Sequence, residues 1–123
     1  MLIRAIIVDD ETDSAEVFAE FLKLKDIDVA GLGKNGKEGV ELYKKHKPDV
    51  VFLDLVMPQY DGFYALEEIK RINPDARIMI ITAFLTDMMK RKLDSFRVKD
   101  VFQKPYSVKE IANSLQEKIK ANT

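Results

Sequence analysis

Five polar side chains in this sequence have the types and positions to act together on a phosphoryl group or a metal ion. Asp54 interrupts an apolar segment, Asp9 and Asp10 follow an apolar run near the N-terminus, and Thr82 and Lys104 each follow a later one. A carboxylate within an apolar segment is costly unless a cation or hydrogen bonds compensate its charge. The central question is therefore what compensates Asp54 and what its carboxylate does.

The chemistry of these groups favours phosphoryl transfer assisted by a divalent cation. If the first and third strands are neighbours, carboxylates at their ends lie about 4.8 Å apart and repel unless a cation lies between them. Mg²⁺ binds a few carboxylates together with waters and a phosphate oxygen. Asp10 and Asp54 could share such an ion, with Asp9 reaching it directly or through a water. Lys104 can hold one anionic oxygen and Thr82 can donate a hydrogen bond to another. An Asp carboxylate can be the nucleophile and form an aspartyl-phosphate, and Asp54 is the acid on which these groups converge.

The segments that must position these residues alternate between strands and helices. Short continuous apolar runs, typical of strands buried in a parallel sheet, occur at residues 2–8, 28–33, 49–55, 77–81 and 100–103. Segments compatible with amphipathic helices lie at residues 15–22, 36–46, 62–72, 85–96 and 108–119. This order predicts an α/β fold in which helices cover both faces of a doubly wound parallel sheet. Ligands of such sheets bind beyond the carboxyl ends of the strands, where all five polar residues fall.

Capping residues mark several helix boundaries. Ser107 with Glu110, and Asn35 with Glu38, have the spacing of capping boxes at helix starts. The Asn-Pro pair at 73–74 predicts a helix end near residue 72, because proline disfavours helical geometry in the residue before it.

Composition restricts the broad class of protein. The 123 residues fit one domain, and the net charge of −1 argues against nucleic-acid binding as the main task. The sequence has no cysteine, which excludes disulfides, zinc–thiolate sites and thiol catalysis. The N-terminal apolar run is short and contains Arg4, so it predicts neither a signal peptide nor a membrane span. We therefore expect a cytoplasmic protein that binds neither membranes nor nucleic acid.

Four sequence blocks together resemble a known family. They are IIVDDE at 6–11, VFLDLVMPQYDG at 51–62, IITA at 80–83 and QKPY at 103–106. Their order and spacing resemble the receiver domain of two-component response regulators, the CheY-like family. The resemblance implies a doubly wound, flavodoxin-like (βα)5 fold whose five-stranded parallel sheet has the order 2-1-3-4-5. It also implies a single receiver domain over residues 1–123, with no output domain.

The same resemblance assigns the acidic residues a role. It implies that Asp54 accepts a phosphoryl group from a histidine kinase or a phosphotransfer protein, with Mg²⁺ as cofactor and Mn²⁺ as an alternative ion. The metal ligands would be Asp9, Asp10, Asp54 and the backbone carbonyl of Val56.

The remaining matched residues would form the switch. Thr82, Ala83 and Lys104 would contact the phosphoryl group, and Lys104-Pro105 would be a cis peptide. Movement of Thr82 would repack a signalling face formed by the fourth helix, fifth strand and fifth helix, with the residues Val101, Gln103 and Tyr106. The receiver would then bind an unknown downstream protein, either as a monomer or as a phosphorylation-dependent dimer.

Three positions depart from the family pattern. Val101 stands where receivers often have an aromatic residue, and Phe102 next to it should point to the opposite face of its strand. Arg97-Val98 replaces a frequent Gly-Ala pair after the fourth helix. Val56 and Phe84, two residues after Asp54 and Thr82, are apolar and cannot orient a hydrolytic water. This predicts a long-lived phosphorylated state.

Two other functions compete with a phosphorylation switch. A magnesium-dependent phosphohydrolase with an Asp nucleophile usually carries a second Asp two residues later as general acid and base, but that position is Val56. A receiver-like interaction module that is never phosphorylated would not need the complete set of acids, Thr82 and Lys104.

Overall fold

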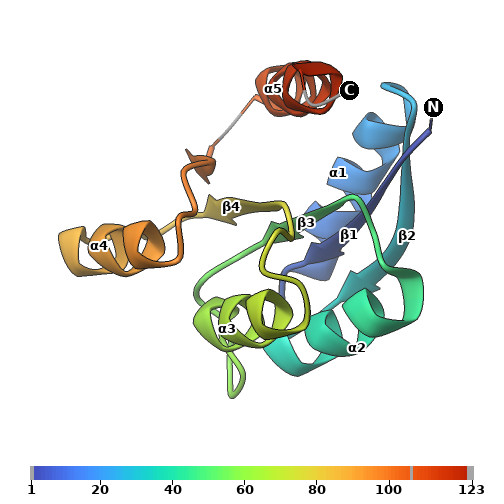
Figure 1. The fold of residues 1–123 in the computed structure, drawn as a ribbon. Helices are drawn as coiled ribbons and strands as arrows, with labels where there is room; N and C mark the ends of the chain where they lie inside the picture. Colours follow the sequence, from blue (N-terminus) through green and yellow to red (C-terminus); the bar gives the residue numbers. More distant parts are fainter. Residues whose placement is uncertain (1, 106, 122–123) are drawn as a thin grey trace.

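A parallel five-stranded sheet forms the centre of the computed structural model, which describes residues 2–105 and 107–121. The strands are β1 (Ile3–Val8), β2 (Ile27–Gly33), β3 (Val50–Leu53), β4 (Ile78–Thr82) and β5 (Val101–Gln103). The helices are α1 (Thr12–Lys23), α2 (Gly36–His46), α3 (Gly62–Ile72), α4 (Asp87–Ser95) and α5 (Val108–Ala121). The strand order β2-β1-β3-β4-β5, with every pair parallel, confirms the expected (βα)5 fold (Figure 1).

Two apolar layers cover the faces of the sheet. Successive side chains of a strand point to opposite faces, so β1 contributes Ile6 and Val8 to one layer and Ala5 and Ile7 to the other. The first layer packs against α2 and α3, and the second against α1 and α5, as their positions below and above the sheet in Figure 1 indicate. The central strands β1, β3 and β4 are almost fully buried because both of their faces are covered.

Side-chain caps start several helices as predicted. Asn35 accepts a hydrogen bond from the Glu38 amide at 2.9 Å, and Ser107 accepts one from the Glu110 amide at 3.3 Å. The Glu38 carboxylate bonds the amide of Lys34 rather than that of the cap residue, which is a variation on the capping box. Helix α3 ends at Ile72, directly before the Asn-Pro pair.

Several predicted boundaries were wrong by a few residues. Helix α1 begins at Thr12, not near Ala15, because its first turn is polar and carries no apolar periodicity. Thr82 is the last residue of β4 rather than the first residue after it, and it pairs with Gln103. Strand β3 ends at Leu53, so Asp54 lies immediately beyond the strand instead of inside it.

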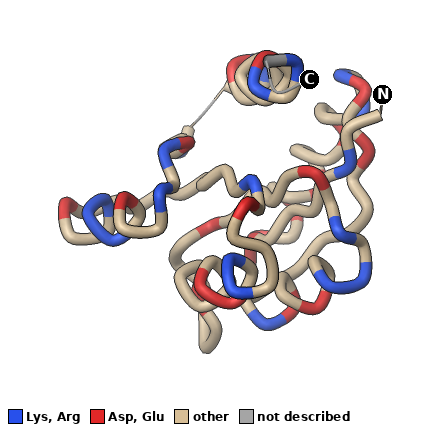
Figure 2. Tube along the Cα trace, viewed as in Figure 1, with Lys and Arg blue, Asp and Glu red and all other residues tan. Residues whose placement is uncertain are grey.

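The helices carry charged residues of both signs (Figure 2). In the part of the chain that the structure describes, no helix is both long enough and apolar enough to cross a bilayer.

Candidate functional site

Adjacent strand ends bring the acidic residues together. Val8 and Leu53 are paired between β1 and β3, so the residues that follow them, Asp9 and Asp54, leave the sheet side by side. The Asp54 amide donates to the Val8 carbonyl at 2.9 Å, and the Asp9 amide donates to the Gly33 carbonyl at 2.9 Å. These backbone bonds hold both acids at the carboxyl edge of the sheet, where the sequence predicted a site.

Three carboxylates form a compact cluster at this edge. One oxygen from each of Asp9, Asp10 and Asp54 lies within 4.8 Å of the other two. Asp9 and Asp54 are only 2% and 5% exposed, whereas Asp10 is exposed. Hard divalent cations prefer such oxygen ligands, and the exposure of Asp10 leaves room for the waters that Mg²⁺ retains. The residues present therefore fit the predicted magnesium site.

Lys104 supplies positive charge to the same cluster. Its Nζ atom donates to Asp9 Oδ2 at 2.9 Å and lies 3.4 Å from Asp54 Oδ2. The Lys104 amide donates to the Thr82 carbonyl at 2.7 Å, which fixes the loop after β5 against the end of β4. Burial opposes the charged form of Lys104, but the hydrogen bond to Asp9 and the charges of Asp54 and Asp9 outweigh it and raise its pKa.

Asp54 has an environment that is partly unfavourable to its charge. Burial raises the pKa of Asp54 above its ordinary value, and nearby Asp9 acts in the same direction. Lys104, the Thr82 hydroxyl and the Val56 amide oppose this increase in pKa. The Val56 amide donates to Asp54 Oδ1 at 3.3 Å, which keeps the Val56 peptide next to the carboxylate. Ligation of a metal by the Val56 carbonyl stays a prediction.

Thr82 lies beside this cluster and is bonded within its own loop. The side chain is fully buried, and its hydroxyl donates to the Phe84 carbonyl at 3.2 Å. Ala83, between them, is exposed. The peptide bond between Lys104 and Pro105 is cis, as predicted.

Gly62 supports the site although the sequence analysis gave it no role of its own. A Cβ atom at this position would lie 2.2 Å from the Asp54 carbonyl oxygen, so any side chain would push the loop after β3 apart. The Gly62 amide also donates to the Leu55 carbonyl at 2.9 Å. The sequence contains one signal for this position, the Asp-Gly pair at 61–62, because Asp is a favoured residue at helix starts. In the structure Asp61 caps α3 by accepting a hydrogen bond from the Tyr64 amide.

Comparison with known proteins agrees with this geometry. A sequence model of the response regulator receiver domain matches residues 5–116. The chain belongs to the response regulator receiver family. This receiver is 33% identical to the chemotaxis protein CheY of Thermotoga maritima over 112 residues, which is 91% of this chain and 93% of that protein. Its identity to CheY of Bacillus subtilis is also 33%, with the same coverage. Its fold is similar to that of a CheY-like receiver domain protein from Methanospirillum hungatei, with a TM-score of 0.91 at 18% identity, covering 98% of this chain and 96% of that one.

Val101 and Phe102 of the receiver pack on opposite faces, as strand alternation predicted. Val101 contacts the layer that includes Leu93 of α4, whereas Phe102 packs into the layer under α1 and α5. The aromatic ring next to Val101 therefore cannot take the place of an aromatic residue at 101.

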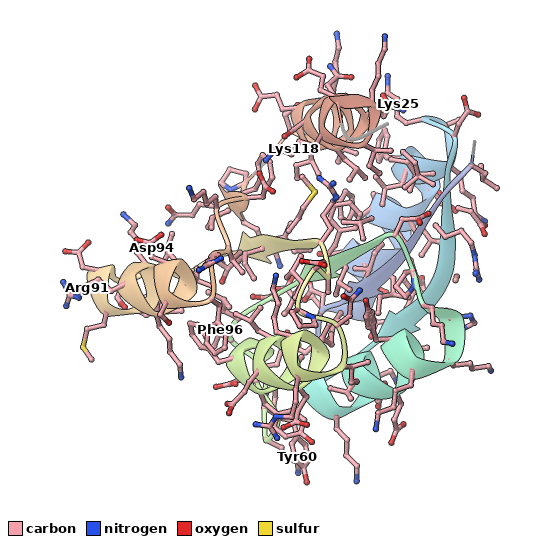
Figure 3. The ribbon with its side chains drawn as sticks, in the orientation of Figure 1. Lys25, Tyr60, Arg91, Asp94, Phe96 and Lys118 are labelled. Atoms are coloured by element: carbon pink, nitrogen blue, oxygen red, sulfur yellow. The ribbon has the colours of Figure 1, made fainter. Side chains whose placement is uncertain are left out.

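Arg97 resolves the second departure from the family pattern. Its φ of 61° places it in the left-handed region, so a non-glycine residue adopts the backbone that glycine usually provides after a helix. Phe96, before it, packs against the layer under α3, toward which it points in Figure 3.

Of the three predicted signalling residues, two can be placed. Val101 is half-buried and Gln103 is exposed, and both line a hollow between α4 and β5. Tyr106 lies outside the described residues.

Proposed function

We propose that this receiver domain accepts a phosphoryl group on Asp54 from a histidine kinase or a phosphotransfer protein in the presence of Mg²⁺. The observation that carries the proposal is the position of Asp54, a nearly buried carboxylate beside two further acids and the ammonium group of Lys104. An Asp carboxylate in such surroundings can act as a nucleophile toward phosphorus.

The proposed transfer has a simple electron balance. An oxygen of Asp54 attacks phosphorus, an O–P bond forms, and the N–P bond to the donor imidazole breaks with its electron pair kept by the nitrogen. Lys104, whose ammonium group already bonds Asp9 and lies near Asp54, would turn part of that interaction toward an oxygen of the transferred group. Mg²⁺, held by the three carboxylates and the Val56 carbonyl, would neutralise charge on the phosphoryl oxygens.

The signal would leave the site through Thr82. Turning of its hydroxyl toward the phosphoryl group, with Ala83 close by, would release the Phe84 carbonyl that it now holds. The loop before α4 would then shift, and the hollow lined by Val101 and Gln103 would change shape for a downstream protein. A cytoplasmic location is part of this proposal, which the similarity to CheY supports.

The phosphorylated state is proposed to be long-lived. Val56 and Phe84 are 54% and 61% exposed, so neither side chain is buried in the core. Neither side chain can donate or accept a hydrogen bond, so neither orients a water molecule for attack on the acyl phosphate. The apolar Val56 side chain also lacks the acid–base group that a phosphohydrolase would need at this position.

The test is phosphorylation with a small donor such as acetyl phosphate, with Mg²⁺, followed by intact-protein mass spectrometry. We expect one added phosphoryl group in the wild type and in Asp94→Asn, an exposed acid on α4, and none in Asp54→Asn. Beryllofluoride, an acyl-phosphate mimic, should change the spectrum of the wild type and leave that of Asp54→Asn unchanged. Phosphoryl uptake by Asp54→Asn would refute the assignment. Multiple-turnover hydrolysis of a small phosphoester would favour the phosphohydrolase instead.

A further inference from the structure

The hollow between α4 and β5 has an apolar lining with little exposure to solvent. Leu93 and Val98 are buried, and Leu85 and Val101 are half-buried. These four side chains contribute to a hollow with a volume of about 470 Å³. Binding sites for small molecules occupy about 300–1,000 Å³ and are lined mostly by apolar side chains. The hollow therefore has the size and the apolar surface of a site for a small molecule.

The aromatic ring of β5 does not enter this hollow. Val101 lines it, whereas the next residue, Phe102, packs into the layer under α1 and α5. Among the described residues that line the hollow, none is aromatic. A ring at position 101 would occupy part of the space that the smaller valine side chain leaves open.

Four exposed polar side chains complete the lining, namely Lys90, Asp94, Lys99 and Gln103. Lys90 and Asp94 lie four residues apart on the same side of α4, where Figure 3 labels Asp94. Neither Lys90 nor Lys99 forms a salt bridge with any residue that the structure describes. Two ammonium groups and one carboxylate give this lining a net positive charge, and the Gln103 amide can donate a further hydrogen bond. The lining therefore favours a ligand with one anionic group.

We propose that the hollow between α4 and β5 binds a small organic carboxylate with a rigid apolar body, of the arylacetate class. The apolar body would contact Leu93, Val98 and Val101, and the carboxylate would accept hydrogen bonds from the ammonium groups of Lys90 and Lys99. A rigid ring system loses little conformational freedom on binding, so more of the gain from burying its apolar surface is kept. The three clustered acids do not line this hollow. Binding to the unphosphorylated chain therefore does not require the proposed phosphorylation of Asp54.

The test is titration of the full unphosphorylated chain with 2-naphthylacetate, followed by backbone amide chemical shifts in ¹H–¹⁵N NMR spectra. A probe of this size should bind with a Kd of about 1 mM or lower. The largest saturable shifts should belong to the amides of Leu93, Val98 and Val101. The neutral probe 2-naphthylacetamide, which has the same apolar body, should bind about threefold more weakly or worse. The absence of saturable shifts, equal binding of the two probes, or saturable shifts centred on another surface would each overturn the proposal.

Charge variants at the exposed lining test the assigned contacts. Lys90→Gln with Lys99→Gln should weaken binding of the acetate probe about threefold or more and leave the acetamide probe unaffected, whereas Asp94→Asn should strengthen binding of the acetate. Lys34→Gln with Lys44→Gln is the matched control, because it removes the same charge from exposed lysines that do not line the hollow, and it should change neither affinity. Equal effects of the two lysine pairs, or weaker acetate binding by Asp94→Asn, would contradict the proposal.

Val101→Phe tests whether the apolar body lies inside the hollow. The added ring should fill the space next to Val101 and weaken binding of both probes about tenfold or more. Unchanged affinity in a variant with the far-ultraviolet circular dichroism of the wild type would overturn the assigned position. If Val101→Phe does not fold, the charge variants decide, because they change only exposed side chains.

Discussion

Removal of Lys104 should destabilise the metal-free protein far more than removal of an ordinary surface lysine. Its Nζ atom lies 2.9 Å from Asp9 Oδ2 and 3.4 Å from Asp54 Oδ2. With an effective dielectric constant of 20, each contact has a gross attraction of about 5 kcal/mol, which desolvation largely offsets. Loss of one partner from a buried ion pair costs roughly 3–5 kcal/mol. The Lys104 side chain keeps 16% of its exposure, so we expect Lys104→Met to lower the free energy of unfolding by about 2–3 kcal/mol.

Urea unfolding in EDTA, followed by far-ultraviolet circular dichroism, measures this loss. Lys90→Met is the control, because Lys90 is exposed on α4 and its replacement should change the free energy by less than about 0.5 kcal/mol. Excess Mg²⁺ should return much of the stability of Lys104→Met, since a bound cation then balances the two carboxylates. Asp54→Asn in the Lys104→Met background should also recover stability. The double variant has one buried carboxylate without an ammonium partner, that of Asp9, whereas Lys104→Met alone has two.

The pH dependence gives a second check on Lys104. The pKa of Lys104 is raised in the folded state, so its contribution to stability is fully present below its unfolded pKa near 10.5 and is lost as pH rises through the higher folded pKa. The difference in unfolding free energy between wild type and Lys104→Met should therefore persist from neutral to mildly alkaline pH. A Lys104→Met protein that is as stable in EDTA as Lys90→Met would refute the reasoning.

Three further predictions use other parts of the structure. Because the pKa of Asp54 is raised in the folded state, its ionisation costs stability as pH rises through that pKa. Asp54→Asn should thus match or exceed the wild type in unfolding free energy in EDTA at neutral pH, and lose this advantage in acid. Arg97→Gly should raise the unfolding free energy by about 0.5–1 kcal/mol in urea titrations, because the φ of 61° suits glycine, whereas Lys99→Gly should lower it. Val56→Asn with Phe84→Glu should shorten the lifetime of the phosphorylated protein, measured by mass spectrometry after removal of the donor. An unchanged decay rate would contradict the assigned role of these two apolar side chains.

The sequence predicted the fold because the signals for it are local. Continuous apolar runs predicted the strands of a covered parallel sheet, and Asn35, Ser107 and the Asn-Pro pair marked helix ends that the structure confirms. The order of the strands came from the family resemblance and not from the pattern, because strand neighbours are determined by packing of the whole chain. The start of α1 at Thr12 was missed since a polar first turn has no periodicity.

The sequence predicted which residues form the site, but not which hydrogen bonds they make with one another. The predicted strand ends placed Asp9, Asp54 and Lys104 on one edge of the sheet. Lys104 is 95 residues from Asp9 in sequence, however, and no local pattern shows that its ammonium group lies closer to Asp9 than to Asp54. The close approach of Gly62 to the Asp54 carbonyl could likewise not be predicted from the sequence, because it arises from the path of the loop after β3 and not from any residue pattern.

The contacts between Thr82 and the loop before α4 could not be predicted from the sequence. Register pairs Thr82 with Gln103 and Ile81 with Phe102, so the Phe102 ring is directed to the layer under α1 and α5, away from Val101. The Thr82 hydroxyl donates a hydrogen bond to the Phe84 carbonyl, which lies in the loop that leads directly into α4. We expect a change at this hydroxyl to act first on residues 83–86 and to reach α4 along the chain. The proposed switch would therefore need no aromatic ring on β5, and we expect its output to depend on the length and sequence of that loop.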